Sequence, residues 1–198
     1  IKEYGADAVR IFILSDSPPE KDVQWSDEGM SSSFKFLQKL WYLNLKILNE
    51  IENNHKGKSQ NDLERITTKF VNSVQNNIEN FSFNKIIANF HEVYSSINKI
   101  INSEISRETW IENYTKILIT MSPVIPHFSC ECLKNLNMTN PKNTFYWPKI
   151  NKKILITDKI NFVIQINGKT RGVLETKADL KENDILDNVR NNQKINNY

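Results

Sequence analysis

The stretch 27–53 constrains the fold more than any other part of the sequence, because its apolar residues recur at helical spacing in two separate stripes. A surface helix needs only one apolar face, so two stripes indicate a helix packed on more than one side, as in a helical bundle. Ser26 fits the N-cap position, and Asp27 and Glu28 follow in the first turn, where the helix dipole favours acidic residues. The stripes are Met30, Phe34, Leu37, Trp41, Leu45 and Leu48, and Phe36, Leu40, Leu43, Ile47 and Ile51.

Three more helices are predicted from apolar residues that repeat with the same period. Pro123 and Pro126 end the last of them, because proline lacks an amide donor and disfavours helix before it. Two shorter helices are expected at 7–14 and 131–136, the second as a cap on the bundle. The three main helices are marked by Leu63, Ile66, Phe70, Val74 and Ile78; by Ile86, Phe90, Val93, Ile97 and Ile100; and by Trp110, Tyr114, Ile117 and Met121.

Toward the C-terminal end of the sequence, the apolar residues change from helical spacing to alternation with polar residues. The alternation is interrupted by an Asn-Gly dipeptide, which predicts a β-hairpin. If 166–168 form a three-residue loop with Gly168 left-handed and bulged, Gln165 pairs with Lys169. A helix then follows, opened by a capping box of Asp179 and Glu182. On this register one face of the hairpin holds Phe162, Ile164, Thr170 and Leu174, and the solvent face holds Gln165, Lys169, Arg171 and Glu175.

These patterns predict a mainly α fold, in which an antiparallel helical bundle is followed by a small, incomplete α+β domain with a β-hairpin. We expect residues 1–24 to lead into the bundle, 25–150 to form it, and 151–198 to form the partial α+β domain. Two strands and one helix make a poor domain, since an isolated hairpin is marginal in water.

Several classes of function are excluded by the residues present. No apolar stretch approaches the roughly 18 to 20 residues of a membrane span, and the first residues lack the features of a signal peptide, so we expect a cytoplasmic protein. Cys130 and Cys132 point about 200° apart on a helix and cannot share a metal ion with His127. Nor is His91 expected to be a catalyst, because nothing has the spacing of a nucleophile and its base. We therefore expect no catalytic and no metal-binding residues, and tryptophans that mostly serve the core.

The charge of +3 is unevenly distributed along the sequence. Residues 151–198 hold 9 Lys and Arg against 6 Asp and Glu, whereas residues 1–150 hold 17 of each. A polyanionic partner would therefore meet the C-terminal part first, although a solubilising surface explains the same excess.

Five motifs in order resemble one family. The segment "YGADAVRIFILSDSPPEKDVQWSDEGMSSSFKFLQKLW" resembles the part of leucyl-tRNA synthetases that follows their KMSKS loop and enters the anticodon-binding bundle. "FSFNKIIANFHE", "MSPVIPHFSCECL", "YWP" and "FVIQINGKTRG" are similar to later landmarks of the same family. "PPEKDVQWSDEG" and "QINGKTRG" favour the bacterial type of the leucine enzyme over its valine, isoleucine and methionine relatives.

The resemblance implies the C-terminal fragment of a leucine–tRNA ligase, a class Ia aminoacyl-tRNA synthetase. The HIGH and KMSKS signatures do not occur in these residues, so leucylation with ATP and Mg²⁺ is expected in a catalytic domain outside this sequence. The implied partners are leucine tRNA and the catalytic and editing domains of the synthetase, with 1–24 linking to the catalytic core. A monomer is expected, with no cofactor in this fragment.

Candidate tRNA-binding residues lie in three places. We expect Asn167, Lys169 and Arg171 to contact the tRNA backbone near its elbow, because cations two apart on one strand face are roughly 6.5 to 7 Å apart, comparable to successive phosphates. Arg107, at a bend between helices, is a weaker candidate. The hairpin residues could instead form a hairpin tip exposed only to solvent. The lysines of the long helix could instead form the solvent-exposed face of an amphipathic helix. The remaining candidates form a strip on the long helix: Lys35, Lys39, Tyr42 and Lys46.

Two other functions remain open at this point. A stand-alone RNA-binding module would carry the same basic hairpin, and a helical scaffold for protein interaction would expose an apolar face. Neither would explain the ordered motifs.

Overall fold

The computed structural model describes residues 2–16, 20–53, 60–138, 146–155, 159–166, 168–177 and 182–190. The chain divides into two compact units, Ile1–Asn151 and Lys152–Tyr198. The first is a helical bundle, and the second contains a β-hairpin and a helix. The predicted mainly α fold is therefore confirmed, while the division into link, bundle and partial α+β domain stays a prediction.

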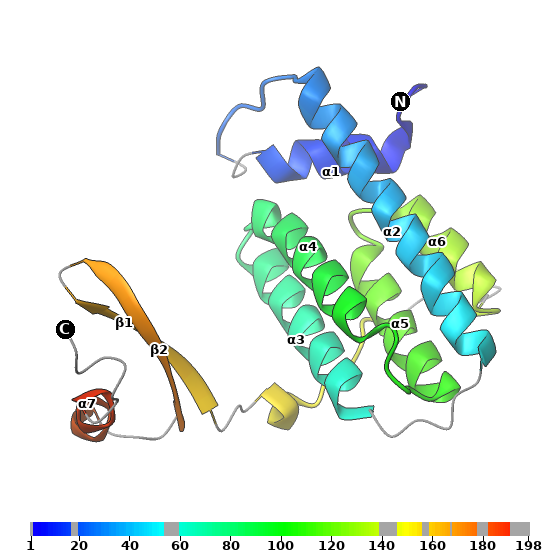
Figure 1. Cartoon of the computed structure of the whole chain (residues 1–198). Coiled ribbons are helices and arrows are strands. Elements are labelled where there is room, and N and C mark those ends of the chain that lie inside the picture. Colours follow the sequence, from blue (N-terminus) through cyan, green and yellow to red (C-terminus); the bar gives the residue numbers. More distant parts are fainter. Residues whose placement is uncertain are drawn as a thin grey trace. The chain divides into compact units, whose positions relative to one another are not determined.

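The first unit places a set of roughly aligned helices beneath α1, which lies across one end of them (Figure 1). Within this set α3 packs against α4 and α5, and α2 packs against α5. α1 packs against α2, α4 and α6 and so ties three helices together. The helices are α1 (Gly5–Asp16), α2 (Asp27–Asn53), α3 (Gln60–Glu79), α4 (Phe83–Ile100), α5 (Arg107–Met121) and α6 (Pro126–Asn135).

The long predicted helix is α2, and Ser26 caps it by accepting a hydrogen bond from the Gly29 amide at 3.1 Å. The stripe that begins at Phe36 is buried in the core along its whole length. The stripe that begins at Met30 is not: Leu37 is half-buried and Leu45 is 46% exposed. The prediction of packing on more than one side is therefore only partly right, because α1 and α6 leave a groove open along the second side of α2.

The core of the first unit is continuous from α1 to α6. Trp110 and Phe90 are fully buried in it, and each such side chain stabilises the fold by roughly 1.5 to 3 kcal/mol. Trp41 and Trp147 pack against the core from its edge. The expectation for tryptophans is wrong for Trp25, which is 64% exposed in the segment before α2, where its Nε1 donates to Asp27.

The last helix of the bundle begins earlier than predicted. α5 ends at Met121, as expected from the two prolines, but α6 begins at Pro126 and not near Glu131. Proline suits the first turn of a helix because its missing N–H has no intrahelical acceptor there. Pro126 therefore starts a helix as well as limiting the preceding one.

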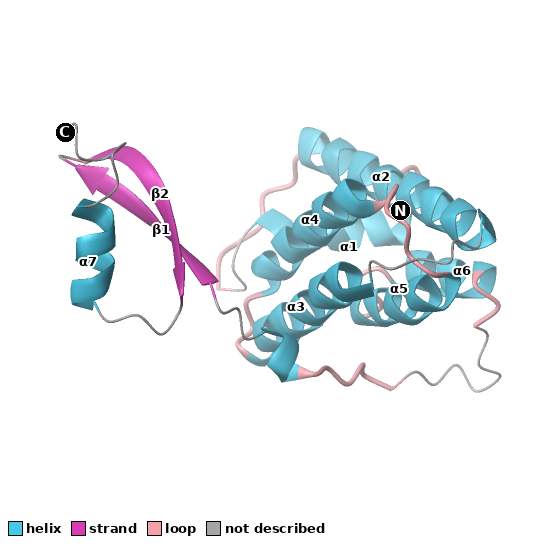
Figure 2. Cartoon of the chain, turned by 60° about the horizontal axis from the view of Figure 1, so that its bottom comes forward, coloured by secondary structure: helices cyan, strands magenta, loops and turns pink. Residues whose placement is uncertain are grey.

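The second unit contains η1 (Lys152–Leu155), β1 (Lys159–Ile166), β2 (Lys169–Lys177) and α7 (Glu182–Arg190). The two strands form an antiparallel hairpin (Figure 2). Gly168 has the predicted positive φ, at 74°. Asp179 of the predicted capping box lies outside the described residues.

The predicted hairpin register is wrong. Ile166 pairs with Lys169 and Gln165 with Thr170, so the loop is two residues long. The extra residue is Arg171, because Ile164 already pairs with Gly172. A bulge within β2 takes the place of the bulge expected at Gly168, and Thr170 therefore lies on the face of Gln165 instead of that of Phe162.

Candidate nucleic-acid interface

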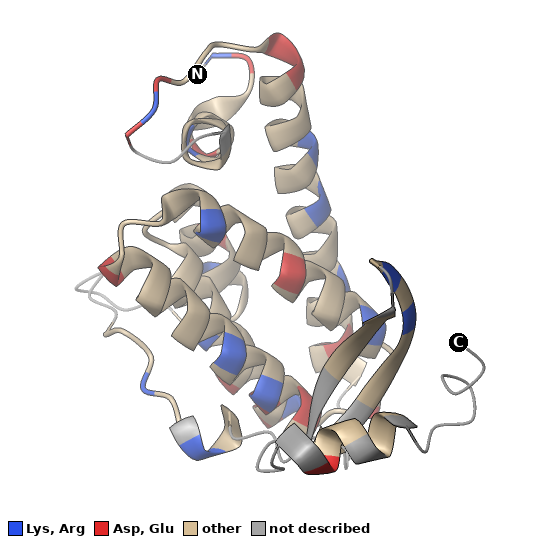
Figure 3. Ribbon diagram, turned by 90° about the vertical axis from the view of Figure 1, so that its left-hand side faces the viewer, with Lys and Arg blue, Asp and Glu red and all other residues tan. Residues whose placement is uncertain are grey.

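The strip predicted on α2 is a continuous feature of the surface. Lys35, Lys39, Tyr42 and Lys46 are all exposed, and Figure 3 shows basic residues recurring along this helix. At 1.5 Å per residue the strip is roughly 16 Å long, long enough to follow two or three phosphates of an RNA strand. The structure thus brings these four predicted residues together.

The strip passes beside α4. His91 of α4 stacks on Phe36 of α2, with ring centroids 3.6 Å apart. Burial lowers the pKa of His91, and the positive charge of Lys39 lowers it further. Lys39 therefore lies close enough to α4 for its charge to reach the imidazole.

At its C-terminal end the strip borders a hollow of about 570 Å³ between α2 and the end of α4. Tyr42 and Lys46 contribute an aromatic ring and a cation to its lining. The polar part of this lining cannot be predicted from the sequence, because no periodicity distinguishes those residues from other surface positions. The remaining lining residues are Leu45, Asn49, Glu50, Asn98, Ile101 and Asn102.

The hairpin candidates lie in the second unit. Lys169 is exposed and Arg171 is half-buried. Because Arg171 is the bulged residue, the two cations do not occupy alternate positions on one strand face, and the spacing expected for successive phosphates does not apply. Asn167 lies outside the described residues.

Arg107 is exposed in the first turn of α5. A cation is unfavourable at this end of a helix, where the dipole is positive, so Arg107 does not stabilise α5. The N-cap is supplied by Ser106, whose hydroxyl accepts from the Thr109 amide at 3.2 Å.

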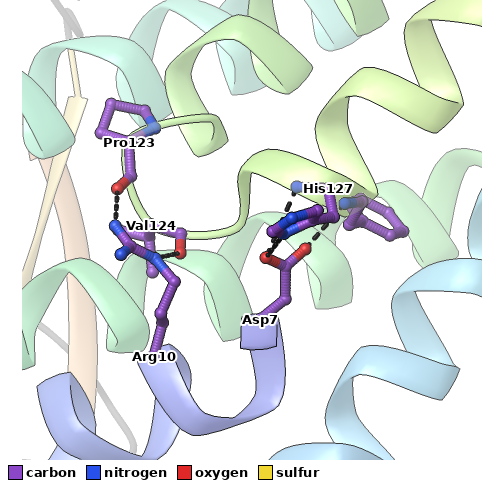
Figure 4. Close-up of polar contacts among 6 residues, drawn as sticks. Asp7, Arg10, Pro123, Val124 and His127 are labelled. Atoms are coloured by element: carbon purple, nitrogen blue, oxygen red, sulfur yellow. Dashed lines mark hydrogen bonds and ion pairs between the residues drawn. The ribbon is translucent and has the colours of Figure 1, made fainter. Parts of the chain in front are cut away.

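A polar latch, which no local pattern in the sequence predicts, joins α1 to the start of α6 (Figure 4). The Asp7 carboxylate accepts hydrogen bonds from the Phe128 amide at 2.7 Å and from His127 Nδ1 at 2.9 Å. Arg10 donates to the carbonyls of Pro123 and Val124, each at 2.6 Å. A carboxylate from α1 thus caps α6, whose own N-cap residue makes no side-chain hydrogen bond.

An apolar groove of about 650 Å³ adjoins this latch between α1, α2 and α6. Its walls include Phe34, Leu37 and Trp41, from the open side of α2. Tyr42 borders both this groove and the polar hollow. A contiguous apolar surface of this kind is typical of a site that contacts another part of a protein.

Cys132 and Tyr114 are titratable residues that lie buried in the core. Burial raises the pKa of the Cys132 thiol to about 12, while Cys130 on the same helix is exposed. Tyr114 donates to Asn44 Oδ1 at 3.1 Å inside the core. No group of His, Cys, Asp and Glu suited to a metal ion occurs in the described parts of the chain. Among those same residues, no helix has the length and apolar character needed to cross a membrane.

A model of the family described as the anticodon-binding domain of tRNA ligase matches residues 60–187. The leucine–tRNA ligase of Petrotoga mobilis is 31% identical over the whole chain, which covers 25% of that protein. For the leucine–tRNA ligase of Thermosipho melanesiensis the identity is 33%, again over the whole chain and 25% of the relative. The chain thus spans about a quarter of the length of these relatives, and its resemblance to leucyl-tRNA synthetases is confirmed.

A solved structure shares the fold. It is the LeuRS of Agrobacterium radiobacter in a ternary complex with tRNA and LeuAMS, and it matches with a TM-score of 0.78 at 22% identity. The match covers 99% of this chain and 26% of that one.

Proposed function

Because the chain belongs to the family of anticodon-binding domains of tRNA ligases, we propose that it is the tRNA-docking part of a leucine–tRNA ligase. The observation that carries the proposal is the alignment of the whole chain with one quarter of leucine–tRNA ligases from different bacteria. The enzyme would act in the cytoplasm as a monomer.

In this function cations of both units bind the RNA backbone. Lys35, Lys39 and Lys46 would neutralise phosphates along α2. Lys169 and Arg171 would do the same from the hairpin, together with Asn167. Each neutralised phosphate releases counterions, so this binding weakens steeply as salt is added.

Leucylation itself belongs to the remainder of the synthetase. ATP and Mg²⁺ would bind in its catalytic domain, and this chain would hold no cofactor. The apolar groove beside α1 offers a surface on which the catalytic or editing domain can rest, because Leu37 and Trp41 remain partly open there. The latch through Asp7 and Arg10 would then keep α1 in place as the join.

The test is a salt-titrated binding isotherm of the chain with leucine tRNA, a non-cognate tRNA and a duplex RNA. Replacing Lys169 and Arg171 by Gln should lower the slope of log affinity against log salt by about one for each cation removed. Lys134→Gln is the matched control, since Lys134 is an exposed cation of α6 that pairs with Glu131.

If the chain bound none of the three RNAs, the tRNA-docking function would be contradicted. An unchanged slope in the double variant would remove the hairpin from the interface. A preference for leucine tRNA would show that these residues discriminate, and equal binding would show that they supply electrostatic docking only.

A further inference from the structure

The short helix α6 depends on its contacts with the rest of the bundle. Its 10 residues are too few for a helix that is stable in water by itself. It packs against α1, α2 and α5. Its backbone hydrogen bonds therefore form and break together with these contacts. The residues on its buried face are Phe128, Ser129, Cys132 and Leu133.

Polar groups interrupt the apolar packing where α6 meets α2 and α5. The Tyr114 hydroxyl of α5 donates to Asn44 Oδ1 of α2 at 3.1 Å and also hydrogen-bonds with the Cys132 thiol of α6. Asn44 Nδ2 and Ser129 Oγ are buried without a hydrogen-bond partner among the residues that the structure describes. Both groups lose water when α6 docks and gain no bond in exchange, so this contact is weaker than an apolar one of equal area.

We propose that α6 is a conformational device, which opens from α2 and α5 as a unit while the rest of the bundle stays folded. Opening returns Asn44 Nδ2 and Ser129 Oγ to water, and closing is favoured by the Asp7 carboxylate that caps α6 from α1. His127 and Phe128 of α6 line the apolar groove, so this groove is complete only in the closed state. The device does not depend on the tRNA-docking function, because none of its contacts involves RNA.

The thiol of Cys132 provides a measurement of this opening. It is fully buried and burial raises its pKa to about 12, so it reacts with iodoacetamide only when α6 is open. Cys130→Ser removes the exposed thiol of the same helix and leaves Cys132 as the only cysteine of the chain. In this background the labelling rate, relative to that of a free thiol, gives the open fraction under native conditions. We expect this fraction to exceed the globally unfolded fraction, obtained from urea unfolding, by roughly ten-fold or more.

Three variants in the same background test the causes. Ser129→Ala removes a buried hydroxyl without a described partner, so it should slow the labelling of Cys132 roughly ten-fold. Asp7→Ala removes the cap and should speed it. Ser33→Ala is the matched control and should leave the rate unchanged, since the buried Ser33 hydroxyl donates to the Gly29 carbonyl within its own helix.

Two results would overturn the proposal. One is labelling of the Cys130→Ser chain no faster than its globally unfolded fraction allows, which would mean that α6 opens only when the whole bundle unfolds. The other is an unchanged rate in Ser129→Ala, or equal slowing in Ser129→Ala and Ser33→Ala, which would mean that the buried hydroxyl of α6 does not weaken its docking.

Discussion

At the scale of the residue, His91 reports on the electrostatics of the lysine strip. Its ring stacks on Phe36, and its pKa lies below the ordinary value of 6.5 because of burial and the charge of Lys39. A lowered pKa in the folded state means that the unfolded state takes up the proton first as the pH falls. The free energy of unfolding should therefore decrease below about pH 6.5 until the folded pKa is passed.

We expect Lys39→Gln to raise the pKa of His91, because it removes the positive charge and leaves the burial unchanged. NMR titration of the imidazole measures this shift directly. Lys35→Gln serves as the control, since only Lys39 is identified as acting on His91. A pKa that does not move in Lys39→Gln would mean that the strip does not pass within electrostatic reach of α4.

At the scale of the element, one carboxylate of α1 caps the start of α6. The Asp7 side chain is 5% exposed and accepts from a backbone amide and an imidazole, whereas the His127 side chain is 75% exposed. Removing the carboxylate leaves the buried Phe128 amide without its acceptor. Removing the imidazole breaks only a solvent-exposed pair.

We expect Asp7→Ala to lower the free energy of unfolding by about 1 to 3 kcal/mol. His127→Ala should cost less than about 1 kcal/mol. Urea unfolding of the two variants separates a cap on α6 from a solvent-exposed side-chain contact. Equal losses in both would show that the amide contact at Phe128 contributes nothing.

The sequence predicted those elements whose signal lies in local periodicity. α2 was predicted with its cap at Ser26, since the stripes and the first-turn acids all lie within one helix. The hairpin was predicted but its register was not, because nothing in the alternation distinguishes a bulge at Arg171 from a bulge at Gly168. The latch and the polar hollow were missed, because Asp7 meets α6, and Asn49 the end of α4, only after the chain has folded.

At the scale of the whole molecule, the two units differ in how they are stabilised. Ile1–Asn151 has a core that includes Trp110 and Phe90. In Lys152–Tyr198, Thr176 is the only buried side chain among those that the structure describes, and Val163 and Val173 are each 59% exposed. A two-stranded hairpin with so little burial is marginal in water.

We therefore expect residues 1–151 to fold alone and to unfold cooperatively, and residues 152–198 to lose the hairpin when they are separated. Circular dichroism and thermal melts of the two pieces measure this. Because Lys35, Lys39 and Lys46 lie within 1–151, that piece should keep the part of leucine-tRNA binding that these lysines supply. For leucine tRNA, the slope of log affinity against log salt should be lower for this piece by the part that Lys169 and Arg171 contribute. A slope identical to that of the whole chain would place tRNA docking entirely on the bundle.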